Sequence, residues 1–165
     1  MKVRPLAVRR VQPLMKVLYW NQRSDAAVTV QLCLDARDAA IPMPFAQMLL
    51  YPVLDCRMNT ESYRKFVDTP LCNSENMKVY WKLYGGDGCS PMEEKCLEGL
   101  PPAYVEAAEF DCLYDEAAAY SEHLRAVGVP VEFHEVKGAM HGYDIALDTP
   151  LMHSLMELRI RFLKK

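Results

Sequence analysis

Two strand–helix pairs follow one another after residue 100, and this alternation limits the choice of fold more than any other feature of the chain. Apolar residues at 102–108 predict a strand, and the alanine-rich stretch 114–127 predicts a helix that ends before Gly128. A second strand at 129–136 and an amphipathic helix at 149–163 repeat the pattern. This spacing is typical of βαβ units, so we expect an α/β fold with a short, mostly parallel sheet flanked by helices.

The sequence before residue 102 indicates one further secure strand. Residues 47–54 form a nearly continuous apolar run, which predicts a strand covered on both faces. Pro52 should end this strand, because proline cannot donate a hydrogen bond to a neighbouring strand. Residues 85–99 are rich in glycine and should be mostly loop. Helices are expected at residues 28–38, 61–67 and 74–84, and Ser74 is expected as the N-cap of the last of these. Including a possible strand at 15–20, the sheet is small for an α/β domain, which indicates a truncated fold.

Composition divides the chain unevenly. With 165 residues, 51% of them hydrophobic and 25% charged, the chain is long enough for one globular domain. Its net charge of −3 gives no reason to expect nucleic acid as a partner. Residues 1–24 nevertheless hold six basic side chains and no acidic one. We therefore expect an atypical basic N-terminal segment at 1–30, followed by the domain itself at 31–165.

The lack of a recognisable targeting signal and the spacing of the cysteines indicate a reducing compartment. No apolar run approaches the roughly 20 residues that span a bilayer, and Lys16 interrupts the apolar window at 14–20, which also lacks a cleavage site. A cytoplasmic location is the default expectation. The six cysteines contain no Cys-x-x-Cys pair, so reduced thiols in or near the core are expected. The four histidines have no ligand-like spacing to these cysteines, and zinc is not expected.

An aspartate and a histidine follow the two strands after residue 100. Asp111 comes where the first strand should end, the edge of a parallel sheet at which active sites lie, and it could orient a histidine. Alternatively, Asp111 or Asp115 caps the following helix. His141 stands between glycines just past the second strand and could act as a general base, or it is a surface-loop histidine. The other histidines lie inside predicted helices or strands: His123, His134 and His153.

The pair has the chain order of a known catalytic arrangement. An acid and then a histidine, 30 residues apart after successive strands, match the last two members of the α/β-hydrolase triad, in which a serine comes first. Several local sequences also resemble hormone-sensitive-lipase-like esterases, the α/β-hydrolase-3 family, over about residues 31–163. These sequences are Leu49-Leu-Tyr-Pro-Val-Leu-Asp55, Gly99-Leu-Pro-Pro-Ala103, Glu109-Phe-Asp111 with Asp115-Glu116, Leu124-Arg-Ala-Val-Gly-Val-Pro130 and His141-Gly-Tyr143. The resemblance implies the C-terminal half of an α/β-hydrolase domain, with Asp111 as triad acid and His141 as triad base.

The position of the nucleophile departs from the family pattern. The family serine stands in Gly-x-Ser-x-Gly before the helix at 28–38, and Ser24 is the hydroxyl residue nearest that place. Gln22 and Ala26 replace the two glycines, and their side chains should crowd the strained elbow. We therefore expect Ser24 to lie out of reach of His141. The family's oxyanion loop, which belongs further upstream, is a second departure because its motif is absent from this sequence. A frameshift or truncation before Gln31 would explain both departures.

The resemblance predicts a serine carboxylesterase acting on a small acyl ester, with no metal or organic cofactor. The alternative is a catalytically silent half-domain that serves as a binding or oligomerising module, or a remnant with no selected role. A short sheet lacking the family's earlier strands leaves an apolar edge, which recruits other strands. We therefore expect a homo-oligomer, most simply a two-fold dimer. Nucleic acid is not expected as a partner, and neither is a membrane span.

Overall fold

A three-stranded parallel sheet forms the centre of the computed structural model, which describes residues 25–85 and 90–165. The strands are β1 (Gln47–Leu50), β2 (Ala103–Phe110) and β3 (Val131–Met140), in the order β1-β2-β3, and both pairings are parallel. The helices are α1 (Asp25–Asp38), α2 (Glu61–Lys65), α3 (Ser74–Gly85), α4 (Tyr114–Ala126) and α5 (Pro150–Leu163), with short 3-10 turns η2 (Pro91–Glu93) and η3 (Tyr143–Ile145). The expected α/β architecture with a short parallel sheet is confirmed.

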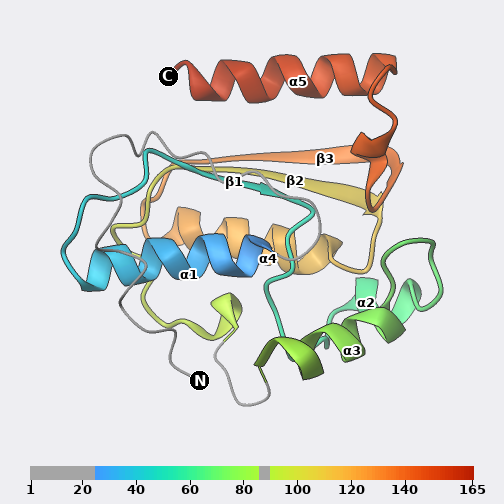
Figure 1. The fold of residues 1–165 in the computed structure, drawn as a ribbon, viewed down its shortest axis with the longest axis horizontal. Helices are drawn as coiled ribbons and strands as arrows, with labels where there is room; N and C mark the ends of the chain where they lie inside the picture. The colour runs from blue at the N-terminus through green and yellow to red at the C-terminus, as the bar shows by residue number, and fades with distance from the viewer. Residues whose placement is uncertain (1–24, 86–89) are drawn as a thin grey trace.

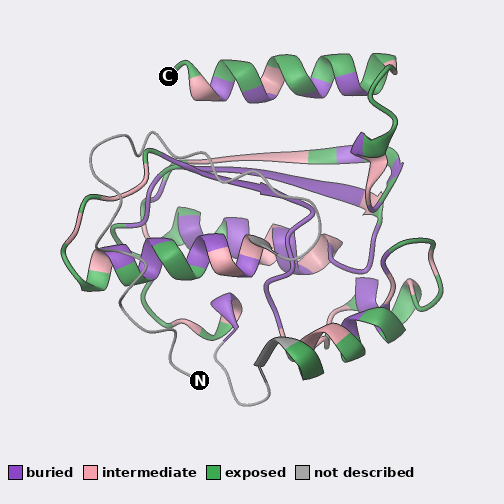
Figure 2. Cartoon of the chain, viewed as in Figure 1, coloured by how far each residue is buried: buried purple, intermediate pink, exposed green. Residues whose placement is uncertain are grey.

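Helices cover both faces of the sheet (Figure 1). On one face, Leu49 and Val105 share a buried cluster with residues of α1 and α4. On the other face, Met48 and Tyr104 pack with Phe162 of α5. Neighbouring strand residues thus point to opposite layers, which is why all four residues of β1 are buried, and β1 and most of β2 carry the buried colour in Figure 2. Among the described helices, none is long and apolar enough to cross a membrane.

Strand ends differ from the predicted bounds for local reasons. Strand β1 stops at Leu50, because Tyr51 takes the left-handed conformation with φ of 38° just before Pro52. Strand β3 continues to Met140, beyond the predicted end at residue 136. The extension includes an irregular register near Gly138, whose φ is 70° and whose N–H donates to Glu109 Oε2 at 2.7 Å. Gly138, which was expected just past this strand, therefore lies within it, at an irregularity.

Side chains cap the starts of α3 and α5, and one of these caps differs from the predicted one. Thr149 caps α5, since its Oγ1 accepts the N–H of Met152 at 3.2 Å. Ser74, the predicted cap of α3, is instead the first residue of that helix, and its hydroxyl donates to Phe66 O at 3.1 Å. Asn73 is the cap in its place, because its Oδ1 accepts the N–H of Asn76 at 2.9 Å. The prediction was therefore one residue too late.

Glu116 is a fully buried acid on α4, and it gives the fold a testable pH dependence. Its Oε1 accepts the N–H of Leu54 at 2.6 Å. Burial raises the pKa of Glu116 well above its usual value, so the folded state favours the neutral acid. The stability that this group contributes is fully present below its unfolded pKa of about 4.3 and is lost as pH rises through the folded pKa.

We therefore predict that Glu116→Gln, which stays neutral, gains stability relative to the unmodified chain as pH increases above about 4.3. Urea unfolding at a series of pH values measures the free energy of unfolding of both proteins. Glu122→Gln, an exposed position of the same helix, is the matched control and should show no such trend. Parallel pH profiles for Glu116→Gln and the unmodified chain would show that the burial of this carboxyl has no linkage to folding.

Candidate active site

Asp111 and His141 meet at the carboxyl edge of the sheet. Asp111 follows the last residue of β2, and His141 follows the last residue of β3. Adjacent parallel strands end at the same edge, so their following residues come together. Asp111 Oδ2 lies 2.7 Å from His141 Nδ1, and the two residues are 0% and 5% exposed. The contact expected from the sequence is confirmed, and the alternative of a surface-loop histidine is wrong.

The second carboxylate oxygen of Asp111 has a separate partner. Asp111 Oδ1 accepts the N–H of Leu113 at 3.1 Å, so this residue also serves the entry to α4. Asp115 does not cap its own helix, because its Oδ2 accepts the N–H of Ser62 in the first turn of α2 at 2.7 Å. The capping alternative is thus wrong for Asp115, and Asp111 bonds the N–H of Leu113, the residue before α4, without capping the helix itself.

The bond to Asp111 defines which ring nitrogen of His141 is available. A carboxylate can only accept hydrogen bonds, so Nδ1 carries the proton in this pair and Nε2 is the basic nitrogen. The ring of Tyr51 lies against the imidazole, with centroids 4.4 Å apart. Tyr51 is held in turn by Asp144, whose Oδ1 accepts the phenol proton at 2.8 Å. The histidine is therefore fixed both by a hydrogen bond and by an aromatic wall.

Gly142 allows the chain to turn directly after His141. Its φ of 75° lies in the left-handed region. A Cβ atom at this position would also lie 3.0 Å from Leu71 Cδ1 and 3.5 Å from Ile145 Cδ1. Leu71 and Ile145 are both exposed, and they form an apolar rim beside the buried histidine. A side chain at position 142 would therefore disturb both the turn and the rim.

A buried ion pair anchors the histidine loop to the sheet and to α5. Glu106 of β2 accepts Arg159 Nε at 2.9 Å and Arg159 Nη2 at 2.6 Å, and both side chains are buried. The carboxylate also accepts the hydroxyl of Tyr104 at 2.5 Å and that of Tyr143. Burial and the Glu106 charge raise the pKa of Tyr143, which therefore remains a neutral donor. Because Tyr143 is two residues from His141, this network holds the loop in place.

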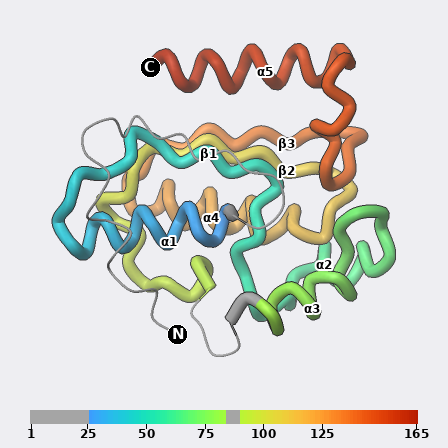
Figure 3. The backbone as a smooth tube through the Cα atoms, viewed as in Figure 1, coloured from blue at the N-terminus to red at the C-terminus, as the bar shows by residue number. Residues whose placement is uncertain are grey.

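Ser24, the hydroxyl residue nearest the position of the family's nucleophile, lies outside the described residues, as does the possible strand at 15–20. Helix α1 begins at the next residue, Asp25, and runs opposite to the strands, so that its first turn lies on the side where the strands end (Figure 3). Ala26, in that turn, packs against the main core. The remaining histidines lie where they were predicted: His123 in α4, His134 in β3 and His153 in α5.

The cysteines agree only in part with the prediction of core thiols. Cys33, Cys72 and Cys112 are buried free thiols, and burial raises the pKa of Cys33 to about 11. Cys56 is half-buried, and Cys96 is exposed, so the prediction is wrong for Cys96. Cys89 lies outside the described residues.

The groups that support the pair were not predicted from the sequence. Glu106 was the detectable one, because a charged residue within an apolar strand must find a buried partner. Its partner Arg159 is 53 residues away and could not be identified from local spacing. Tyr51 and Tyr143 stand within motifs that the family resemblance had already marked, but their contacts depend on how the two loops meet.

Comparison with known proteins agrees with this geometry. The sequence pattern of the alpha/beta hydrolase fold matches residues 26–145. Esterase LipI of Mycobacterium tuberculosis is 32% identical over 116 residues, covering 66% of this chain and 36% of that protein. Carboxylesterase NlhH of Mycobacterium tuberculosis is 33% identical over 137 residues, covering 76% of this chain and 42% of that protein.

A solved structure shows the same arrangement of elements. The crystal structure of esterase LipW from Mycobacterium marinum matches with a TM-score of 0.81 and 28% identity, covering 86% of this chain and 47% of that chain. The chain thus spans less than half the length of these relatives. The sheet, the matching family pattern and the similar esterases together show that this chain belongs to the α/β-hydrolase fold family, among the hormone-sensitive-lipase-like esterases.

Proposed function

We propose that the chain carries the acid and the base of a serine esterase that hydrolyses carboxylic esters. The observation behind this proposal is the bond of 2.7 Å between Asp111 Oδ2 and His141 Nδ1, buried at the carboxyl edge of the sheet. An acid–histidine pair in this setting matches the arrangement that activates serine in α/β-hydrolases. The sequence similarity to esterases supports the same reaction class.

In this mechanism His141 moves protons and Asp111 keeps its ring in the productive state. His141 Nε2 takes the proton of a serine hydroxyl while the serine oxygen attacks the ester carbonyl. The imidazolium then returns this proton to the departing alcohol, and the acyl group stays on the serine. Water, deprotonated by the same nitrogen, releases the acid. Asp111 stabilises the positive ring in both halves of the reaction, and burial strengthens that interaction.

We assign the nucleophile to Ser24, and two observations support the assignment. Helix α1 starts at the following residue, as the helix after a nucleophile elbow should. The first turn of that helix also lies on the side where β2 and β3 end (Figure 1), and His141 directly follows β3. Ser24 itself lies outside the described residues, so our expectation that crowding keeps it out of reach of His141 is untested, and the assignment stands as its alternative.

The proposed substrate is a small ester with an apolar acyl or alcohol group. Leu71 and Ile145 form an exposed apolar rim beside Gly142, the residue that follows the histidine. Apolar surface of this kind favours hydrocarbon over charged substituents. A comparison of p-nitrophenyl acetate with its longer acyl homologues would measure this preference.

Hydrolysis of p-nitrophenyl acetate by the purified chain tests the proposal. We expect turnover that is lost in both His141→Ala and Ser24→Ala. His123→Ala and Ser154→Ala, exposed positions on α4 and α5, are matched controls and should retain the rate. No turnover by the folded, unmodified chain would instead favour the catalytically silent half-domain. Turnover retained in His141→Ala would remove the proposed role of the histidine.

We further propose that the chain forms a two-fold dimer. Helix α5 carries exposed apolar residues, which water alone would cover in a monomer. These residues are Leu151, Met156 and Ile160. A stable dimer should bury well over about 1,000 Å². Sedimentation velocity at micromolar concentration is expected to show twice the monomer mass, and a single species at the monomer mass would contradict the proposal.

A further inference from the structure

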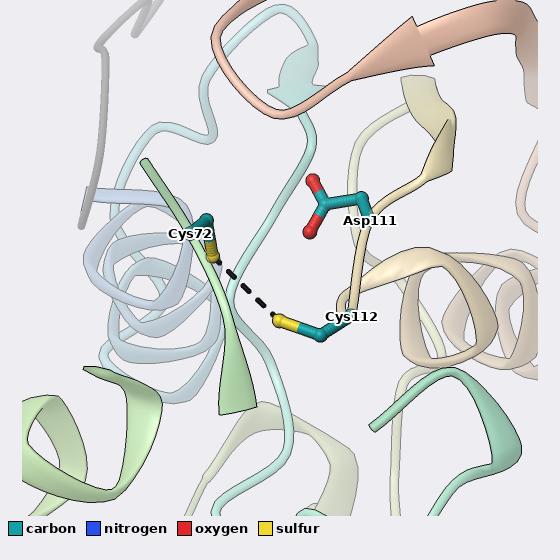
Figure 4. A group of neighbouring side chains, drawn as sticks. All are labelled: Cys72, Asp111 and Cys112. Atoms are coloured by element: carbon teal, nitrogen blue, oxygen red, sulfur yellow. Dashed lines mark hydrogen bonds between the residues drawn. The ribbon is translucent and has the colours of Figure 1, made fainter. Parts of the chain in front are cut away.

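Two buried thiols face each other beside Asp111 (Figure 4). Cys72 Sγ and Cys112 Sγ are 3.7 Å apart, and together with a carboxylate oxygen of Asp111 they form a group of ligand atoms within 4.8 Å of one another. All three residues are buried. Two sulfurs therefore converge with an oxygen of Asp111, the carboxylate that also contacts His141.

The fold brings these three side chains together from distant parts of the chain. Asp111 and Cys112 follow one another at the end of β2. Cys72 comes from the segment between α2 and α3, 40 residues earlier. A local turn holds Cys72, since its N–H donates to Pro70 O at 2.8 Å and its carbonyl accepts Thr69 Oγ1 at 2.6 Å. Its position is thus defined by the backbone, and it does not depend on the other thiol.

The spacing of the sulfurs matches a tetrahedral metal site. With zinc–sulfur bonds of about 2.3 Å, tetrahedral geometry separates two thiolates by about 3.8 Å. The observed separation is 3.7 Å. A donor set of sulfur with a single carboxylate also favours soft or borderline ions such as zinc and cadmium over magnesium or calcium. The bite of the two thiols is therefore already suited to such an ion.

We propose that Cys72, Cys112 and Asp111 bind a thiophilic divalent metal ion of the zinc class. Binding forms two metal–sulfur bonds and one metal–oxygen bond, and the two thiol protons leave to solvent. In the metal-free chain, the hydrogen bond to Cys112 and burial raise the pKa of the Cys72 thiol, which keeps this thiol neutral. This neutrality is compatible with its position among the apolar neighbours Val53 and Leu113.

Metal binding has a consequence for His141 that rests on the proposed function. Asp111 is both a member of the thiol cluster and the partner of His141 Nδ1. A carboxylate that coordinates the ion gives up negative charge that would otherwise stabilise the imidazolium. The ion should therefore inhibit ester hydrolysis without occupying the substrate site.

Cadmium titration of the whole chain tests binding independently of activity. The other cysteines are first simplified with Cys56→Ala, Cys89→Ala and Cys96→Ala, which leave the buried thiols in place. We expect one equivalent of cadmium to produce the ultraviolet thiolate-to-metal band. Cys72→Ala or Cys112→Ala should weaken binding by more than the roughly 100-fold that loss of an outer partner costs. Cys33→Ala, a buried thiol of another cluster, is the matched control and should leave the titration unchanged.

Absence of the band at stoichiometric cadmium, or a band unaffected by Cys72→Ala and Cys112→Ala, would overturn the proposal. X-ray absorption of the zinc-loaded parent provides a measurement that needs neither of these variants, and it should count two sulfurs per zinc; one or none would also overturn it. Hydrolysis is measured separately. A chain that binds cadmium through both thiols but has no esterase activity would contradict the proposed function alone.

Discussion

Asp111→Asn is expected to lower kcat for ester hydrolysis by about ten-thousandfold, with a much smaller change in KM. Asparagine keeps the shape of the side chain, but it cannot stabilise a positive imidazole and it permits the wrong ring tautomer. The effect should be large because Asp111 is fully buried and water cannot replace its carboxylate beside His141 Nδ1. Steady-state hydrolysis of p-nitrophenyl acetate measures both constants.

Asp115→Asn is the matched control for this experiment. Asp115 lies four residues further along and serves α2 through its bond to the N–H of Ser62, so its loss should reduce stability and leave kcat nearly unchanged. Equal losses of kcat in Asp111→Asn and Asp115→Asn, with both variants folded, would mean that the aspartate contributes only to structure.

Arg159→Met is expected to reduce the free energy of unfolding by about 3–5 kcal/mol. The substitution removes the bidentate partner of Glu106 and leaves a carboxylate at 0% exposure with only hydroxyl donors. Urea unfolding measures the loss. Arg161→Met, an exposed position two residues along the same helix, is the matched control and should change stability little.

A second substitution separates the charge from the packing of this ion pair. Glu106→Gln introduced together with Arg159→Met should recover part of the loss, because no uncompensated charge then remains buried. A double variant that is less stable than Arg159→Met by the full cost of Glu106→Gln alone would show that the two residues act independently. That result would contradict the account of the network.

The strands and helices after residue 100 were predictable because each has an uninterrupted pattern and a clear end. Gly128, at φ of 80° after α4, is where the sequence analysis expected a helix to stop. The end of β3 was not predictable, since the irregularity at Gly138 involves a hydrogen bond from the Gly138 N–H to the Glu109 carboxylate of the neighbouring strand. The cap of α3 was placed one residue late because Asn73 and Ser74 are both favourable cap residues and only their contacts distinguish them.

The acid–histidine pair was predictable for a reason of topology. Asp111 and His141 follow successive parallel strands, and the fold class alone brings such positions together. The thiol cluster and the Glu106 network have no such rule, because their members come from segments 40 and 53 residues apart. The boundary at residue 30 and the role of Ser24 stay predictions.

Fluorophosphonate labelling followed by peptide mass spectrometry tests whether His141 and Asp111 activate a serine. The probe phosphonylates a serine only when a neighbouring base removes the hydroxyl proton as fluoride leaves. The account predicts one labelled residue, Ser24, in the unmodified chain, and loss of that label in His141→Ala but not in His123→Ala. A chain that takes no label while folded, or a label that persists in His141→Ala, would contradict the claim that His141 and Asp111 activate a serine.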